Sequence, residues 1–138
     1  MNRPVISIEL NGEDAPFLPG GALSGEYRID IEDPQAIRSL ELSVLWYTSG
    51  QGEEDLAVHD FRRYAIDEEH VVQPRAGDFR SGGRFRTVLP MSPLSYDGIL
   101  VKVHWCVRVR VFLAHGREVV EEHGFRMGHV PSAKIVTA

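Results

Sequence analysis

Histidines and a single cysteine are the residues of this chain whose chemistry can be tested first. The sequence holds six histidines, at positions 59, 70, 104, 115, 123 and 129, and one cysteine, Cys106. No two histidines have the H-x-H or H-x-x-x-H spacing, although a metal site on a strand usually uses residues i and i+2 of one face. The sequence therefore predicts no metal site, and we expect no cofactor.

Cys106 and His104 are the one nucleophile and base that the spacing brings together. Two residues apart on a strand, they share a face with backbone positions about 6 to 7 Å apart. A catalytic thiol also needs an oxyanion donor and a base within hydrogen-bond reach. A thiol enzyme is the least favoured function, and Cys106 is more typical of a small apolar filler under a covering segment.

Other catalytic and ligand motifs are missing from the sequence. It contains no G-x-S-x-G, no P-loop and no G-x-G-x-x-G. The glycine-rich residues 81–84 lack the following helix that a phosphate cradle needs. The acidic runs at 53–55 and 67–69 lack EF-hand spacing and are typical of solvated faces. We therefore expect a protein that is not an enzyme and has no catalytic residues.

Composition restricts the partner and the compartment. The net charge of -5 argues against nucleic acid, because binding to phosphates needs a basic face. One cysteine cannot form an internal disulfide, which fits a reducing cytoplasm. No apolar run is long enough for a signal peptide or a membrane span. These features predict a cytoplasmic protein with no nucleic-acid partner and no integral membrane segment.

One long run of alternating residues must position Cys106 and His104. From Val101 to Val111 every odd position is apolar, whereas most even positions are polar or charged. A period of two is that of a strand with one buried face. The run therefore predicts an antiparallel sheet covered on one side.

Further strands are expected on both sides of this run. They cover residues 5–10, 23–31, 37–47, 56–66, 84–89 and 118–127, with a loop over 67–82. We expect a bulge near Asp60 and Phe61. In the return strand we expect Val120 and Phe125 to point inward, with a register slip at Gly124. The sequence thus predicts an all-β, immunoglobulin-like antiparallel sandwich of about seven to eight strands in two sheets. A single domain would cover residues 1–130, and 131–138 would be a flexible tail.

Three motifs connect the strands in a recognisable order. They are residues 17–25 (FLPGGALSG), 85–90 (FRTVLP) and 93–98 (PLSYDG). Within the first, Gly25 falls inside a strand and predicts a close approach of another backbone. In order and spacing, over about residues 5–127, the motifs resemble the arrestin-like families: the N-terminal halves of arrestins, the arrestin-like retromer subunit and bacterial sporulation-control proteins.

The resemblance implies an arrestin-type sandwich that acts as an adaptor or scaffold and not as an enzyme. A full arrestin has two such sandwiches, whereas this chain has room for one, so a homodimer would supply the second. The family's polar core of buried paired charges has no counterpart that we can place. No receptor-binding residue is therefore carried over.

The outward face of the long strand is the candidate binding surface. It carries Lys102, His104, Cys106, Arg108, Arg110 and Phe112. Cover by the 67–82 loop would explain the apolar members, and a surface for a partner or a second copy would also explain them. We predict protein binding through Lys102, His104, Arg108, Arg110 and Phe112. The alternative is a small-ligand or carbohydrate-binding sandwich that uses Trp46, Tyr47 and Tyr64, and burial of Trp46 would argue against it.

Overall fold

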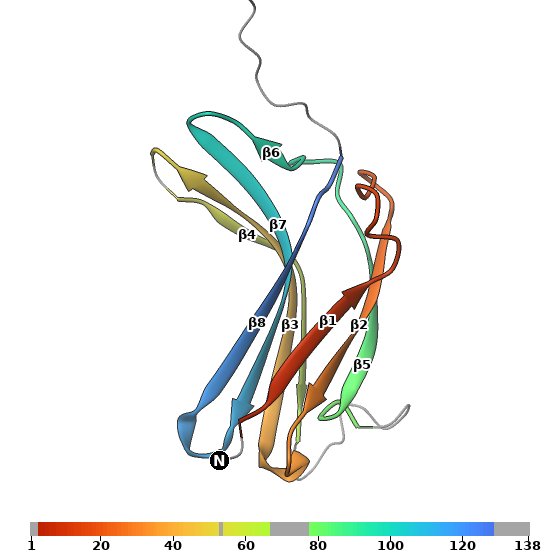
Figure 1. Ribbon diagram of the computed structural model, residues 1–138, viewed down its shortest axis with the longest axis vertical. Coiled ribbons are helices and arrows are strands. Elements are labelled where there is room, and N and C mark those ends of the chain that lie inside the picture. The colour runs from red at the N-terminus through yellow and green to blue at the C-terminus, as the bar shows by residue number, and fades with distance from the viewer. Residues whose placement is uncertain (1–2, 53, 67–77, 129–138) are drawn as a thin grey trace, which may run out of the picture.

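In a computed structural model, the chain forms two antiparallel sheets (Figure 1). The structure describes residues 3–52, 54–66 and 78–128. The smaller sheet has the order β1 (Val5–Leu10), β2 (Ala22–Asp30) and β5 (Gly82–Val88). The larger sheet has the order β4 (Leu56–Ala65), β3 (Ile37–Gly50) and β7 (Val101–Leu113). The free edge of β7 pairs with both β8 (Glu118–Phe125) and the two-residue β6 (Tyr96–Asp97). Short 3-10 turns cover Pro34–Ala36 and Ala114–Gly116.

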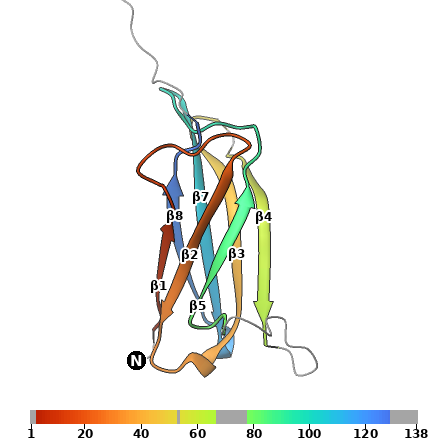
Figure 2. The same cartoon turned by 90° about the vertical axis from the view of Figure 1, so that its right-hand side faces the viewer.

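The two sheets enclose one apolar core. Figure 2 shows β1, β2 and β5 in front of β3, β7 and β8, with β4 beside β5. Inward residues of the central pair lie opposite one another, as in Val44 with Val107 and Leu42 with Val109, and all four are almost fully buried. Leu23 and Phe85 close this core from the smaller sheet. The predicted alternation of the long strand is therefore confirmed.

Most strand positions agree with the sequence expectations. β1 has the predicted bounds, and the other strands begin and end within a few residues of them. Val44 pairs with Asp60 but Leu45 pairs with Val58, so His59 is an extra residue and forms the expected bulge. The close approach at Gly25 is also present, because a Cβ there would overlap the carbonyl oxygen of Glu9.

The return strand β8 differs from the expectation. It pairs with β7 in one unbroken register from Glu118 to Phe125, with no slip at Gly124. Phe125 lies opposite Trp105 in the core. This pairing decides which alternate residues of β8 face inward, and Val119 is one of them. Val120 is 42% exposed and faces outward, and its predicted inward orientation is wrong. Two adjacent valines made the alternation ambiguous, and the partner strand decides between them.

The described end of the 67–82 loop enters the core instead of covering the outward face of β7. Phe79 is buried and stacks on Tyr64 with the ring centroids 6.0 Å apart. Its carbonyl oxygen accepts a 3.0 Å hydrogen bond from the hydroxyl of Tyr27. Residues 67–77 and the predicted tail at 131–138 lie outside the described residues.

Side chains of β4 close one side of the sandwich. His59 Nε2 lies 2.6 Å from the carbonyl oxygen of Val88 on β5. Arg62 donates to the carbonyl oxygen of Arg86 on the same strand. Both contacts join the free edge of the smaller sheet to the bulged strand of the larger one.

Candidate binding surface on the five-stranded sheet

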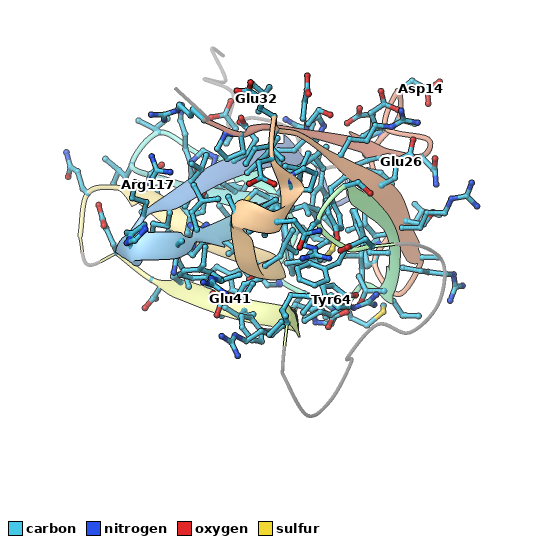
Figure 3. The ribbon with its side chains drawn as sticks, turned by 90° about the horizontal axis from the view of Figure 1, so that it is seen from below. Asp14, Glu26, Glu32, Glu41, Tyr64 and Arg117 are labelled. Atoms are coloured by element: carbon cyan, nitrogen blue, oxygen red, sulfur yellow. The ribbon has the colours of Figure 1, made fainter. Side chains whose placement is uncertain are left out.

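The outer face is the set of side chains on β4, β3, β7 and β8 that point away from the smaller sheet. In the upper half of Figure 1, β3, β4 and β7 bend away from the smaller sheet and curve this face. Cross-strand register places Val58, Leu45, Cys106 and Gly124 in one row over it. Figure 3 shows Glu41 on this face and Glu26 on the opposite outer surface of the molecule.

Ion pairs fill one half of the outer face, which we call the charged half. Arg108 Nε lies 2.5 Å from a carboxylate oxygen of Glu122 on β8. Arg110 and Arg63 approach the two oxygens of Glu41 at 4.0 and 3.9 Å. The two arginines predicted to bind protein are therefore already paired within the sheet.

The other predicted binding residues also have partners nearby. Arg110 lies over the Phe112 ring, 6.0 Å from its centroid. Lys102 Nζ lies 3.2 Å from a carboxylate oxygen of Asp97. The ring of His104 lies 2.7 Å from Ser49 Oγ. All five predicted residues share the outer face, but they follow one strand and do not gather into one cluster.

Apolar side chains make up the other half of the outer face, which we call the apolar half. Leu45 and Cys106 point outward but are 0% and 4% exposed. Beside them Leu56, Val58 and Phe61 of β4 are 55%, 49% and 52% exposed, and we call these three the apolar patch. Sequence reasoning missed this patch. The signal was the slip in alternation, since the extra residue at His59 brings both Val58 and Phe61 to the outer face.

The Cys106 thiol is poorly suited to nucleophilic chemistry. Burial, helped by the negative charge of Glu122, raises its pKa to about 11. The thiolate is the reactive form, so little of it is present near neutral pH. The ring of His104 hydrogen-bonds Ser49 and stacks on Tyr47 at 4.9 Å between centroids. These contacts do not favour the nucleophile and base considered from the sequence.

The three aromatic residues of the carbohydrate alternative do not form a common platform. Trp46 is partly buried and packs against the core, as its alternation predicted. Tyr64 also packs against the core and stacks on Phe79. Tyr47 remains on the outer face, opposite His104.

Within residues 3–52, 54–66 and 78–128, no group of three or more His, Cys, Asp or Glu side chains is placed to hold a metal ion. Over these same ranges, no helix is long and apolar enough to cross a membrane.

Together, the two sheets and their strand order define a β-sandwich of the arrestin type. The fold is similar to the crystal structure of Spo0M, a sporulation control protein from Bacillus subtilis, with a TM-score of 0.60 and 12% identity. The match covers 92% of this chain and 50% of Spo0M, so the chain spans half the length of that protein. The arrestin-like relation expected from the three motifs is confirmed at the level of the fold.

Sequence comparisons add no closer relation. No protein-family model matches the chain, and no curated protein matches it significantly. At 12% identity the structural likeness carries the fold and not a function.

Proposed function

We propose that this protein is a non-enzymatic adaptor or scaffold module that binds a partner protein through the outer face of its larger sheet. One observation carries the proposal: the apolar patch is exposed beside the buried Leu45 and Cys106 and is bordered by ion pairs. An apolar centre with a polar rim is the usual anatomy of a protein interface. Contiguous exposed apolar residues also mark interaction sites more often than isolated ones do.

The predicted binding residues would form the rim of this interface. Lys102, His104, Arg108 and Arg110 would orient the partner more than they hold it, since rim charges act mainly on the association rate and on specificity. Arg110 and Arg63 share the single carboxylate of Glu41, which leaves one positive charge in excess within this group of three residues. We therefore expect the partner to bring a carboxylate to this group, beside an apolar centre.

A second copy of this chain is one such partner, and a different protein is the other. The proposal places the encounter in the cytoplasm, where a single unpaired cysteine stays reduced. The raised pKa of Cys106 supports a role without covalent catalysis.

The proposal is tested by affinity capture of the tagged protein from its native extract, with the native mass of the eluate determined. The test variant combines Val58→Ser and Phe61→Ser. We expect it to lose the captured partner, or to lose the dimer mass if the partner is a second copy. The matched control combines Val5→Ser and Met91→Ser, at side chains 65% and 72% exposed away from the apolar patch.

Two outcomes would overturn the proposal. One is wild-type capture by the patch variant at wild-type thermal stability. The other is equal loss of capture in the patch variant and in the control, which would indicate a general loss of solubility.

A further inference from the structure

A pocket of about 540 Å³ opens where the edge of β7 passes from β8 to β6. β8 pairs with β7 as far as Trp105, and β6 pairs with it at Val103 and Lys102. His104 lies between these two pairings and lines the pocket. The volume lies within the range that small-molecule sites use, roughly 300–1,000 Å³.

Gly124 borders this pocket and has no evident structural need to be glycine. Every other described glycine either has a positive φ or would bring a Cβ within 3.1 Å of a neighbouring atom. Gly124 has neither property, because its nearest neighbour would be the Trp105 carbonyl oxygen at 3.7 Å, an ordinary contact. Glycine in the interior of a strand lowers the stability of that strand. At position 124 neither the backbone conformation nor a close neighbour requires it. What it leaves is free space beside Cys106, its partner in the register.

The walls around this space are aromatic. Tyr47 and His104 line the pocket as a stacked pair, with an angle of 25° between their planes. Tyr96 lines it from β6. A flat ring would fit such surroundings, because aromatic groups prefer offset-stacked or edge-to-face contacts with one another.

Within the part of the chain that the structure describes, the charges of the lining leave one cation without an ion-pair partner. Lys102 is paired with Asp97, and Glu122 is paired with Arg108. Arg126, which is exposed, also lines the pocket and has no ion-pair partner among the described residues. A guanidinium binds a carboxylate through two parallel hydrogen bonds.

We propose that this pocket binds a small aromatic carboxylate. The ring would occupy the space over Gly124, against Cys106 and the stacked Tyr47 and His104. The carboxylate would lie toward Arg126. The pocket adjoins the apolar patch, because Tyr47 pairs with Leu56, and it shares Lys102 and His104 with the proposed rim. None of the three patch side chains lines it, so it does not require that the patch bind protein.

The test is a titration of the full chain with 3-phenylpropionate, followed through the backbone amide signals in two-dimensional NMR. We expect saturable shifts centred on Gly124, Cys106 and His104. The neutral analogue 3-phenylpropionamide should bind about tenfold more weakly, the loss expected for one charged hydrogen bond. Shifts that do not saturate, or that spread over both sheets, would overturn the proposal.

Two variants test separately how the aromatic ring and the carboxylate of the ligand contribute to binding. Gly124→Val should abolish binding of both compounds at an unchanged or raised Tm, because valine suits a strand and would fill the space. Arg126→Gln should weaken the carboxylate about tenfold and leave the amide unchanged. Wild-type affinity in Gly124→Val would contradict the assignment. If that variant does not fold, Gly124→Ala gives the same test with a smaller side chain.

A third variant keeps this inference distinct from the proposed function. Val58→Ser with Phe61→Ser removes apolar side chains from β4 but none from the pocket lining. It should bind 3-phenylpropionate as wild type does, even where it no longer captures a protein. Loss of 3-phenylpropionate binding in this variant would show that the pocket depends on the apolar patch and would overturn the claim that it binds the ligand independently.

Discussion

The charged and apolar halves of the outer face lie on the same strands but differ in what their neighbours supply. In the charged half, Arg110 and Arg108 meet carboxylates on the adjacent strands, Glu41 and Glu122. In the apolar half, Cys106 lies between Leu45 and Gly124, with no charged group opposite it on either strand. One half resembles an ordinary solvated sheet surface, whereas in the other half the buried Leu45 and Cys106 adjoin the exposed apolar patch of β4.

This difference shows where binding energy can come from. Exposed ion pairs contribute little net free energy, because each charge is already solvated and each side chain must be ordered. Covering apolar surface yields roughly 25 cal/mol for each Å² removed from water. The apolar half is therefore the better candidate for affinity, and the charged half for orientation.

Truncating Leu45 should give the largest effect. Leu45 is fully buried although it points outward. Leu45→Ala should lower the free energy of unfolding by about 3 kcal/mol, as in a true core. Leu56→Ala, on the same face but 55% exposed, should cost about 0.5 kcal/mol. Urea unfolding measures both, and equal costs would remove the distinction between the buried and exposed parts of the apolar half.

Removing the shared carboxylate of the charged half should have a smaller effect. Glu41→Gln leaves Arg63 and Arg110 without an anion between them, at a cost of about 1 kcal/mol. Added salt should reduce the difference from wild type, because it screens partly exposed charges. The control is Glu118→Gln, which lies opposite Phe112 and takes part in no ion pair among the described residues. A salt-independent loss would mean that Glu41 acts through packing.

Acid sensitivity should arise mainly outside both halves, at Asp78 and Asp60. Hydrogen bonds from Arg80, at 2.8 Å from its Nε to each carboxylate oxygen, hold the pKa of Asp78 below its usual 3.8. Burial alone would raise the pKa of Asp60, but the Thr87 hydroxyl and Arg62 outweigh it and lower that pKa.

A carboxylate with a lower pKa in the folded state stabilises the fold above its unfolded pKa. That contribution is lost as the pH falls through the lower, folded value. Stability should therefore fall below about pH 4, and Asp78→Asn should flatten this fall. Thermal unfolding from pH 2 to 7 measures it, and an unchanged acid limb in Asp78→Asn would argue against this assignment.

The smallest expected effect is on the rate at which the Cys106 thiol is alkylated. With its pKa raised to about 11, alkylation by iodoacetamide should be slow at pH 7 and should still be accelerating at pH 10. Protein unfolded in urea is the control and should react with the pH profile of an ordinary thiol. A plateau below pH 8 in the folded protein would show an activated cysteine and reopen the enzyme hypothesis.

Much of the fold could be predicted from the alternation of apolar and polar residues within individual strands. The alternation in β7 is unambiguous because five of its inward residues, Trp105, Val107, Val109, Val111 and Leu113, are buried in the core. β8 is an edge strand with two adjacent valines, so its phase depends on the pairing of Phe125 with Trp105. A pairing between distant strands is not contained in either strand alone.

The candidate site could be predicted only in part. The outward residues of β7 were identified correctly as one face, because period two fixes them. The apolar patch depends on the bulge at His59. This extra residue reverses, for the residues that follow it on β4, which side chains point inward and which point outward. The pocket depends on where β8 leaves β7 and β6 replaces it, and the two-residue β6 is too short to show a period.

The contacts of His59 and Arg62 with β5 have a consequence for storage and expression of this protein. A free strand edge can template pairing with other chains and lead to fibrils. Here the carbonyl groups of Val88 and Arg86 on the β5 edge are already occupied by side chains of the same molecule. A chain that exposes an apolar patch is thereby protected, at one of its edges, against indiscriminate polymerisation.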